Sequence, residues 1–120
     1  MLNHRVKIVV PSTQNVNESI DNSKQVEMVA TRLVALFGGA TVRDREDENT
    51  PRTTVKNALG YWLSDTAGVV VEAVKEVESL TDSLTDEQIE EVIKIAIELR
   101  DTMGQESVLY EIDGIAYFTE

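Results

Sequence analysis

Apolar and polar positions alternate at the start of the chain. Within residues 5–10, Val6, Ile8 and Val10 occupy every second position, and Pro11 follows them. A period of two is typical of a strand that buries one face, and proline cannot donate to a sheet. The sequence therefore predicts a strand over 5–10 that ends at a polar loop, PSTQNVNESIDNS, which is rich in residues that favour turns.

A helical period follows this loop. Its apolar residues recur at i, i+3, i+4, i+7 and i+11 and are Val26, Val29, Ala30, Leu33 and Phe37. Asp21, Asn22 and Ser23 are all good N-caps, Asn22 and Gln25 have the spacing of a capping box, and Gly38 can end the helix in a left-handed conformation. We expect a helix that ends at Phe37 and packs its apolar stripe against a sheet.

The second helical segment runs from Thr85 to Gly104. Thr85 and Gln88 form a capping-box pair, and Gly104 is a stop signal. The expected buried stripe is Ile89, Val92, Ile93, Ala96 and Met103. The opposite face carries an acidic set, Glu87, Glu90, Glu91, Glu98 and Asp101, which only Lys94 and Arg100 relieve. Like charges at helical spacing cost stability, so this face is either solvated or a surface for a partner.

Further segments favour strands. Residues 108–112 and 115–118 flank Asp113-Gly114, the dipeptide preferred in a two-residue type I′ turn. Residues 61–63 turn through 64–68 into a triple valine, which predicts another hairpin. Residues 69–80 also fit a helical stripe, but valines directly after a turn favour a strand. A short strand is expected after Gly38-Gly39.

The predicted order of elements is β-α-β-β-β-α-β-β within a single domain, residues 1–120. This order is typical of an α+β fold with two helices packed on one face of a mostly antiparallel sheet, and the ferredoxin-like split βαβ arrangement is the natural candidate. A charged loop insertion spans about residues 43–58. A length of 120 residues is near the commonest size of one domain.

Composition narrows the class of protein. The chain has no cysteine, which excludes disulfides and thiolate metal sites. No apolar run approaches the ~20 residues of a membrane span. The start, MLNHRVKIVVPST, lacks the apolar stretch of a signal peptide. We therefore expect a soluble cytoplasmic protein that does not bind a membrane.

The net charge of −11 is unevenly distributed. Residues 1–70 hold eight acidic and eight basic residues, whereas residues 71–120 hold fourteen acidic and three basic ones. Direct nucleic-acid binding needs clustered lysine and arginine and is not expected. The acidic half suits a solvated helix face, or a basic protein partner whose surface normally faces nucleic acid.

The sequence offers little for catalysis. The acidic run 44–49 fails the calcium-loop spacing, because Asn49 stands where glycine is needed and Val55 where glutamate is needed. Gly38-Gly39 matches no phosphate-binding motif. His4, the only histidine, is expected to be a frayed surface residue without the positioned partner that acid–base catalysis requires. We assign no catalytic residue, no metal and no cofactor.

Trp62 and Glu72 are the most suggestive single residues. Trp62, the only tryptophan, either stacks on a ligand or interface or packs its hairpin against the core. Glu72 lies among valines, where a carboxylate either faces solvent or has a partner. The residues alone leave both alternatives open.

The runs PSTQNV, IDNS, LFGGAT, GYW and VVVE, with MGQESV and a final IDG hairpin, resemble a family of small uncharacterised proteins of bacteria, phages and plasmids. The resemblance spans nearly the whole chain and implies a fold and a mobile-element origin, but no activity. Here the connection between LFGGAT and GYW is longer and more charged, and the last hairpin is more acidic. A ligand site common to the family would map onto Ser12, Thr13, Asn15, Asp21, Asn22, Gly39, Thr41, Trp62 and Glu72.

Three functions follow from these observations. The favoured one is a non-enzymatic acidic module, such as an anti-defence inhibitor of a mobile element, whose acidic helix set masks a basic nucleic-acid-binding surface of a host protein. The second is a small-molecule-binding protein or modest enzyme that uses the loop 11–22 with Trp62 and Glu72. The third is a structural or oligomeric module, such as a homodimer formed through exposed sheet edges.

Overall fold

The computed structural model describes residues 1–14, 18–43, 59–64 and 68–120. Its centre is a five-stranded antiparallel sheet in the order β4-β7-β1-β8-β9. These strands are β1 (His4–Val10), β4 (Thr41–Arg43), β7 (Lys75–Thr81), β8 (Leu109–Ile112) and β9 (Ile115–Phe118). Two further strand pairs are separate from this sheet, namely β2 (Thr13–Gln14) with β3 (Glu18–Ser19) and β5 (Leu59–Ser64) with β6 (Gly68–Ala73).

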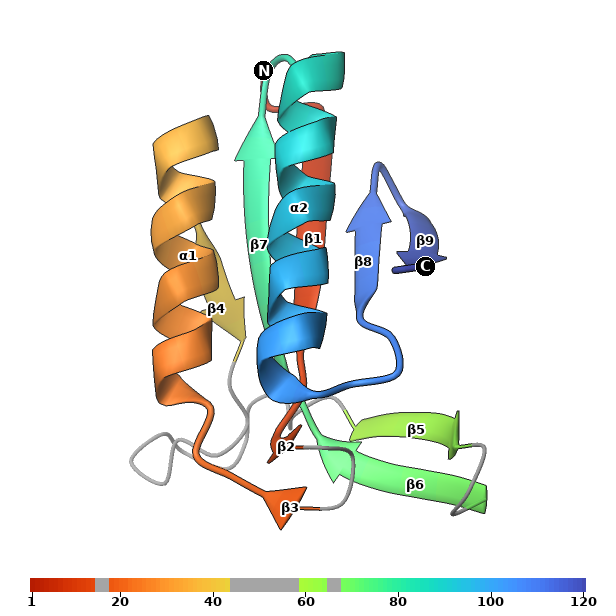
Figure 1. Ribbon diagram of the computed structural model, residues 1–120. Helices are drawn as coiled ribbons and strands as arrows, with labels where there is room; N and C mark the ends of the chain where they lie inside the picture. The colour runs from red at the N-terminus through yellow and green to blue at the C-terminus, as the bar shows by residue number, and fades with distance from the viewer. Residues whose placement is uncertain (15–17, 44–58, 65–67) are drawn as a thin grey trace, which may run out of the picture.

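Helices α1 (Ser23–Phe37) and α2 (Asp86–Met103) lie side by side on one face of the five-stranded sheet (Figure 1). α1 packs mainly on β7, and α2 packs on β8 and β1. α1 connects β1 to β4 with β7 between them, and α2 connects β7 to β8 with β1 between them. This is the split βαβ topology. The fold is therefore α+β and ferredoxin-like, as the sequence predicts, with β9 added at one edge.

The core lies between the helices and the sheet. β1 contributes Val6, Ile8 and Val10, which are all fully buried. The buried helix residues that meet them are Val26, Val29, Leu33, Val92, Ile95, Ala96, Leu99 and Met103. On α2, Ile95 and Leu99 are thus buried although the expected stripe omitted them, whereas Ile89 and Ile93 are only half-buried. Because the apolar face of α2 is wide, periodicity alone does not fix which of its apolar residues point at the sheet, and packing against the sheet decides this.

Three of the four helix ends follow the local signals. Gly38 ends α1 with φ 87° and donates its N–H to the carbonyl of Val34. Thr85 begins α2 with both hydrogen bonds of the capping box, each shared with Gln88. Gly104 ends α2 with φ 61°. These three predictions are confirmed, because each depends on residues within one turn of the helix end.

The start of α1 is different. Asn22 stands at the N-cap position, but its side chain makes no cap hydrogen bond. Gln25 Oε1 is buried and has no hydrogen-bond partner among the described residues. The predicted capping box between these two residues is therefore wrong. The reason is a competing acceptor, because Asn22 Nδ2 donates to the carbonyl of Pro11 at 2.8 Å, in the loop that precedes the helix.

Residues 69–80 are extended, as the sequence favours, but they form two strands in different sheets. Before Val74, β6 pairs with β5, which confirms the hairpin predicted through residues 64–68. After Val74, β7 pairs with β1 and β4. The polar loop also contains the short pair β2–β3, which the sequence did not predict. Of the expected charged insertion, residues 44–58 lie outside the described residues.

No helix in the described part of the chain is long and apolar enough to cross a lipid bilayer.

Candidate functional site

Most residues expected to bind a ligand come from the loop between β1 and α1, which leaves one end of the sheet. At this end Val10, the last residue of β1, pairs with Lys75, the first residue of β7. The chain continues from Val10 into the polar loop, and it reaches Lys75 from β6 through Val74. Figure 1 shows β2, β3, β5 and β6 at this same end, below the helices. The loop-end site is defined here by Ser12, Thr13, Asp21, Asn22, Lys75 and Gln105.

Hydrogen bonds hold the described part of the polar loop in place. The N–H of Ile20 donates to the carbonyl of Ser12 at 2.9 Å, which closes the loop on itself. Asn22 ties the loop to α1, and its side chain is only 3% exposed, so its amide nitrogen is committed to the carbonyl of Pro11. Gln105, which follows α2, donates from Nε2 to the carbonyl of Thr13 at 2.8 Å. Asn22 is therefore a structural residue that holds the loop, and its amide nitrogen is not available to a ligand.

Asp21 and Lys75 give the loop-end site its charge. The hydroxyl and the N–H of Ser23 donate to Asp21 Oδ1 at 2.6 Å and 3.0 Å. These hydrogen bonds lower the pKa of Asp21, and the charge of Lys75 acts in the same direction. Asp21 is exposed, so it is an ionised and accessible acceptor at neutral pH. A carboxylate near an ammonium group suits a ligand that carries both charges.

Two further residues expected to bind a ligand, Trp62 and Glu72, lie in the β5–β6 ribbon. Trp62 is opposite Val70, and Glu72 is opposite Gly60. Opposite residues share a face of a ribbon, as do alternate residues of one strand, so Trp62 and Glu72 occupy diagonal positions on one face. Glycine has no side chain to fill the position opposite Glu72. Asn15 lies outside the described residues. Gly39 and Thr41 are away from the loop end, because the carbonyl of Gly39 accepts a hydrogen bond from Ser79 and Thr41 pairs with Glu78 within β7.

The acidic set expected to meet a protein partner lies along α2. Three of its five carboxylates have ion-pair partners, in the pairs Glu91–Lys94, Asp101–Arg100 and Glu98–Arg32. The pair with Arg32 joins α2 to α1, and sequence spacing gave no sign of it because the two residues are 66 positions apart. Glu87 and Glu90 are exposed. The charge that this face offers to a partner is therefore smaller than its composition indicates.

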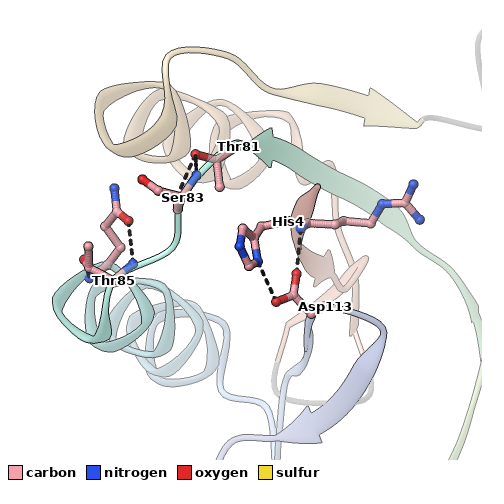
Figure 2. A network of polar contacts seen from close by, with 7 residues as sticks. His4, Thr81, Ser83, Thr85 and Asp113 are labelled. Carbon is pink, nitrogen blue, oxygen red and sulfur yellow. Dashed lines mark hydrogen bonds and ion pairs between the residues drawn. The ribbon is translucent and has the colours of Figure 1, made fainter. Parts of the chain in front are cut away.

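At the opposite end of the sheet, His4 has a partner that sequence reasoning missed. His4 Nδ1 lies 2.9 Å from Asp113 Oδ2, and Asp113 Oδ1 accepts a hydrogen bond from the N–H of Arg5 at 2.9 Å (Figure 2). His4 also begins β1 opposite Thr81, so it is held in the sheet and the expectation of a frayed residue is wrong. The sequence does predict the type I′ turn that contains Asp113, but Asp113 is 109 positions from His4, so spacing could not connect the two residues.

The His4–Asp113 pair borders a depression of about 320 Å³. Its lining residues are Leu2, Asn3, His4, Arg5, Leu80, Asp113 and Gly114. Thr81 lies nearby, but its hydroxyl donates to the carbonyl of Ser83 and accepts from the N–H of Ser83, in the turn that leads into α2 (Figure 2). The Thr81 hydroxyl is thus hydrogen-bonded to Ser83, and Figure 2 draws no hydrogen bond from it to His4 that would activate it as a nucleophile. The pair therefore serves as a tether between β1 and the β8–β9 turn.

Among the described residues, no three histidine, aspartate or glutamate side chains are grouped so that they could hold a metal ion. The loop-end site offers the exposed carboxylate of Asp21, the ammonium group of Lys75 and the hydroxyl groups of Ser12 and Thr13. These groups suit a small polar organic ligand.

Comparison with known proteins gives a likeness in structure alone. The sequence matches no family model and no curated protein. The fold is similar to that of a phage SAM lyase in complex with S-methyl-5′-thioadenosine, with a TM-score of 0.67 and 18% identity over 96% of this chain and 87% of that chain. It is also similar to a phage SAM lyase in the apo state, with a TM-score of 0.63 and 20% identity over 97% of this chain and 87% of that chain. At this identity the likeness establishes a common fold.

Proposed function

We propose that the protein binds SAM at the loop-end site and the adjoining β5–β6 ribbon, and that it cleaves SAM as a small lyase. The observation that carries this proposal is the likeness of fold over 96% of the chain to a phage SAM lyase in complex with S-methyl-5′-thioadenosine. The same observation supports the small-molecule alternative above the acidic partner-binding module. The internal ion pairs of the acidic α2 face point in the same direction.

The groups at the loop end suit the chemistry of SAM. SAM joins an adenosine, a sulfonium cation and an amino-acid group that carries both an ammonium and a carboxylate. Asp21 and Lys75 offer the opposite charges for that amino-acid group. Trp62 supplies an aromatic position that can stack on adenine or face a cation, and Glu72 supplies a carboxylate on the same face of the ribbon.

The reaction changes the charge of the ligand, which gives Glu72 a specific role. A lyase breaks a bond without adding water. When the bond between the sulfur of SAM and its amino-acid chain breaks, the electron pair stays on sulfur and leaves S-methyl-5′-thioadenosine, which is a neutral thioether. The amino-acid chain balances the lost bond either by closing on its own carboxylate oxygen as a lactone or by losing a proton to form a double bond. A carboxylate near the sulfur therefore binds the cationic substrate more strongly than the neutral product. We assign this role to Glu72, with Trp62 as the aromatic contact.

Calorimetric titration with SAM and with S-methyl-5′-thioadenosine, together with a chromatographic assay for release of S-methyl-5′-thioadenosine from SAM, tests the proposal. The wild type is expected to bind both compounds and to turn over SAM. Glu72→Gln should weaken SAM binding by about tenfold or more and change binding of the neutral product little. Glu87→Gln, on the exposed side of α2, is the matched control. Absence of binding and turnover with the wild type at millimolar SAM would end this proposal.

A further inference from the structure

Gln105 connects the end of α2 to the polar loop. Its backbone is fixed by the helix terminus, since its N–H donates to the carbonyl of Arg100 at 2.9 Å directly after Gly104. The position of its Cα relative to α2 is therefore fixed, and its side chain extends from there toward the polar loop. Nε2 reaches the carbonyl of Thr13 at 2.8 Å, the hydroxyl of Thr13 at 3.3 Å and the carbonyl of Met103 at 3.2 Å.

The described part of the loop contains little regular structure. β2 and β3 are two residues each, which is too short to be stable without support. Among the loop residues whose side chains the structure describes, Ile20 packs against the core cluster, whereas Ser12 and Thr13 are not part of it. Gln105 thus joins Thr13 to the end of a helix whose apolar face is buried in the core.

We infer that Gln105 is a positioning residue of the loop-end site, which sets the place of Ser12 and Thr13 relative to α2 and so the geometry in which the loop receives its ligand. This inference rests on the proposed function. Gln105 acts through Thr13, and its loss releases the loop while the core between helices and sheet stays packed. The expected consequence is weaker ligand binding with little change in the stability of the fold.

Gln105→Met removes the N–H donors and keeps a side chain of similar length. Affinity for S-methyl-5′-thioadenosine, measured by calorimetry, is expected to fall about tenfold, which corresponds to the loss of one or two hydrogen bonds. Amide hydrogen exchange at Thr13 and Ile20 should become faster, since the loop opens more often. The melting temperature should change little. Gln105→Lys, which restores a donor, is expected to recover part of the affinity and of the exchange protection.

Gln88→Met is the matched control, because Gln88 is the glutamine at the other end of α2 and belongs to its capping box. This variant should lower the melting temperature without changing affinity, which is the reverse of the Gln105→Met pattern. If the wild type binds and Gln105→Met binds equally well, Gln105 is not a positioning residue although the proposed function stands. If the wild type binds neither SAM nor S-methyl-5′-thioadenosine, the proposed function fails and the positioning of a ligand fails with it.

Discussion

Asp113 occupies a turn and an ion pair at once. Its φ of 51° is the left-handed conformation that a type I′ turn requires and that aspartate adopts more readily than most residues. The His4 ring and the N–H of Arg5 bind its carboxylate, and they lower the pKa of Asp113. The unfolded chain lacks these contacts. Asp113 therefore stabilises the fold above its unfolded pKa, near 4, and this stabilisation is lost as the pH falls through the lower pKa of the folded state.

Asp113→Asn separates the two roles, because asparagine tolerates the same turn conformation but cannot ionise. We expect the variant to be less stable than the wild type at neutral pH, and to lose stability less steeply than the wild type below about pH 4. Urea unfolding at a series of pH values measures both effects. Asp82→Asn, at an exposed position outside this pair, is the control. Equal pH dependence in Asp113→Asn and the wild type would contradict the assignment.

At the scale of elements, the end of α1 depends on a single backbone conformation. Gly38 has φ 87° and donates its N–H to the carbonyl of Val34, whereas Gly39 is not in the left-handed region. A methyl group added at either glycine would have no atom within 4 Å. Any difference between alanine substitutions at these two positions is therefore conformational and not steric.

We expect Gly38→Ala to lower the free energy of unfolding by about 1–2 kcal/mol, because an alanine there must adopt a left-handed conformation. Gly39→Ala should be close to neutral, or slightly stabilising because it restricts the unfolded chain. Urea denaturation of both variants provides the comparison. Equal losses at the two positions would show that the left-handed cap is not what ends the helix.

At the scale of the whole molecule, the fold brings cations of the neutral half of the chain to the acidic half. Lys7 Nζ lies 3.0 Å from Glu76 Oε2 and 3.2 Å from Glu111 Oε2, so it joins β1 to the strands on either side. Glu78, which is only 6% exposed, lies near both Arg5 and Arg43. Burial lowers the pKa of Lys7, but the hydrogen bonds and charges of its two carboxylates outweigh burial and raise it above its ordinary value.

Lys7→Met leaves Glu76 and Glu111 half-buried without their shared cation. We expect a loss of about 1–3 kcal/mol in the free energy of unfolding, mostly from the stranded carboxylates. Lys94→Met is the control, since Lys94 forms an exposed pair with Glu91 and should cost less than about 0.5 kcal/mol. The triple variant Lys7→Met, Glu76→Gln, Glu111→Gln should recover most of the loss. A similar cost for both single lysine variants would contradict this account.

Local signals in the sequence determined the helix ends at Gly38, Thr85 and Gly104, the turn at Asp113-Gly114, and the apolar periods from which the α+β class follows. Each of these features depends on contacts between residues within a few positions of one another, so it can be predicted from spacing in the sequence alone. That Trp62 and Glu72 occupy the same face of the ribbon also follows from the strand period once the hairpin is known.

Only the tertiary structure decided which distant groups meet. It placed Gln105 against Thr13, Asp113 against His4 and Arg32 against Glu98, and it moved the side chain of Asn22 from the helix cap to the carbonyl of Pro11. It also divided residues 69–80 between two sheets. The physical reason is the same in each case, because a polar group takes the partner that packing of the core brings within hydrogen-bond distance, and that distance is unrelated to separation along the chain.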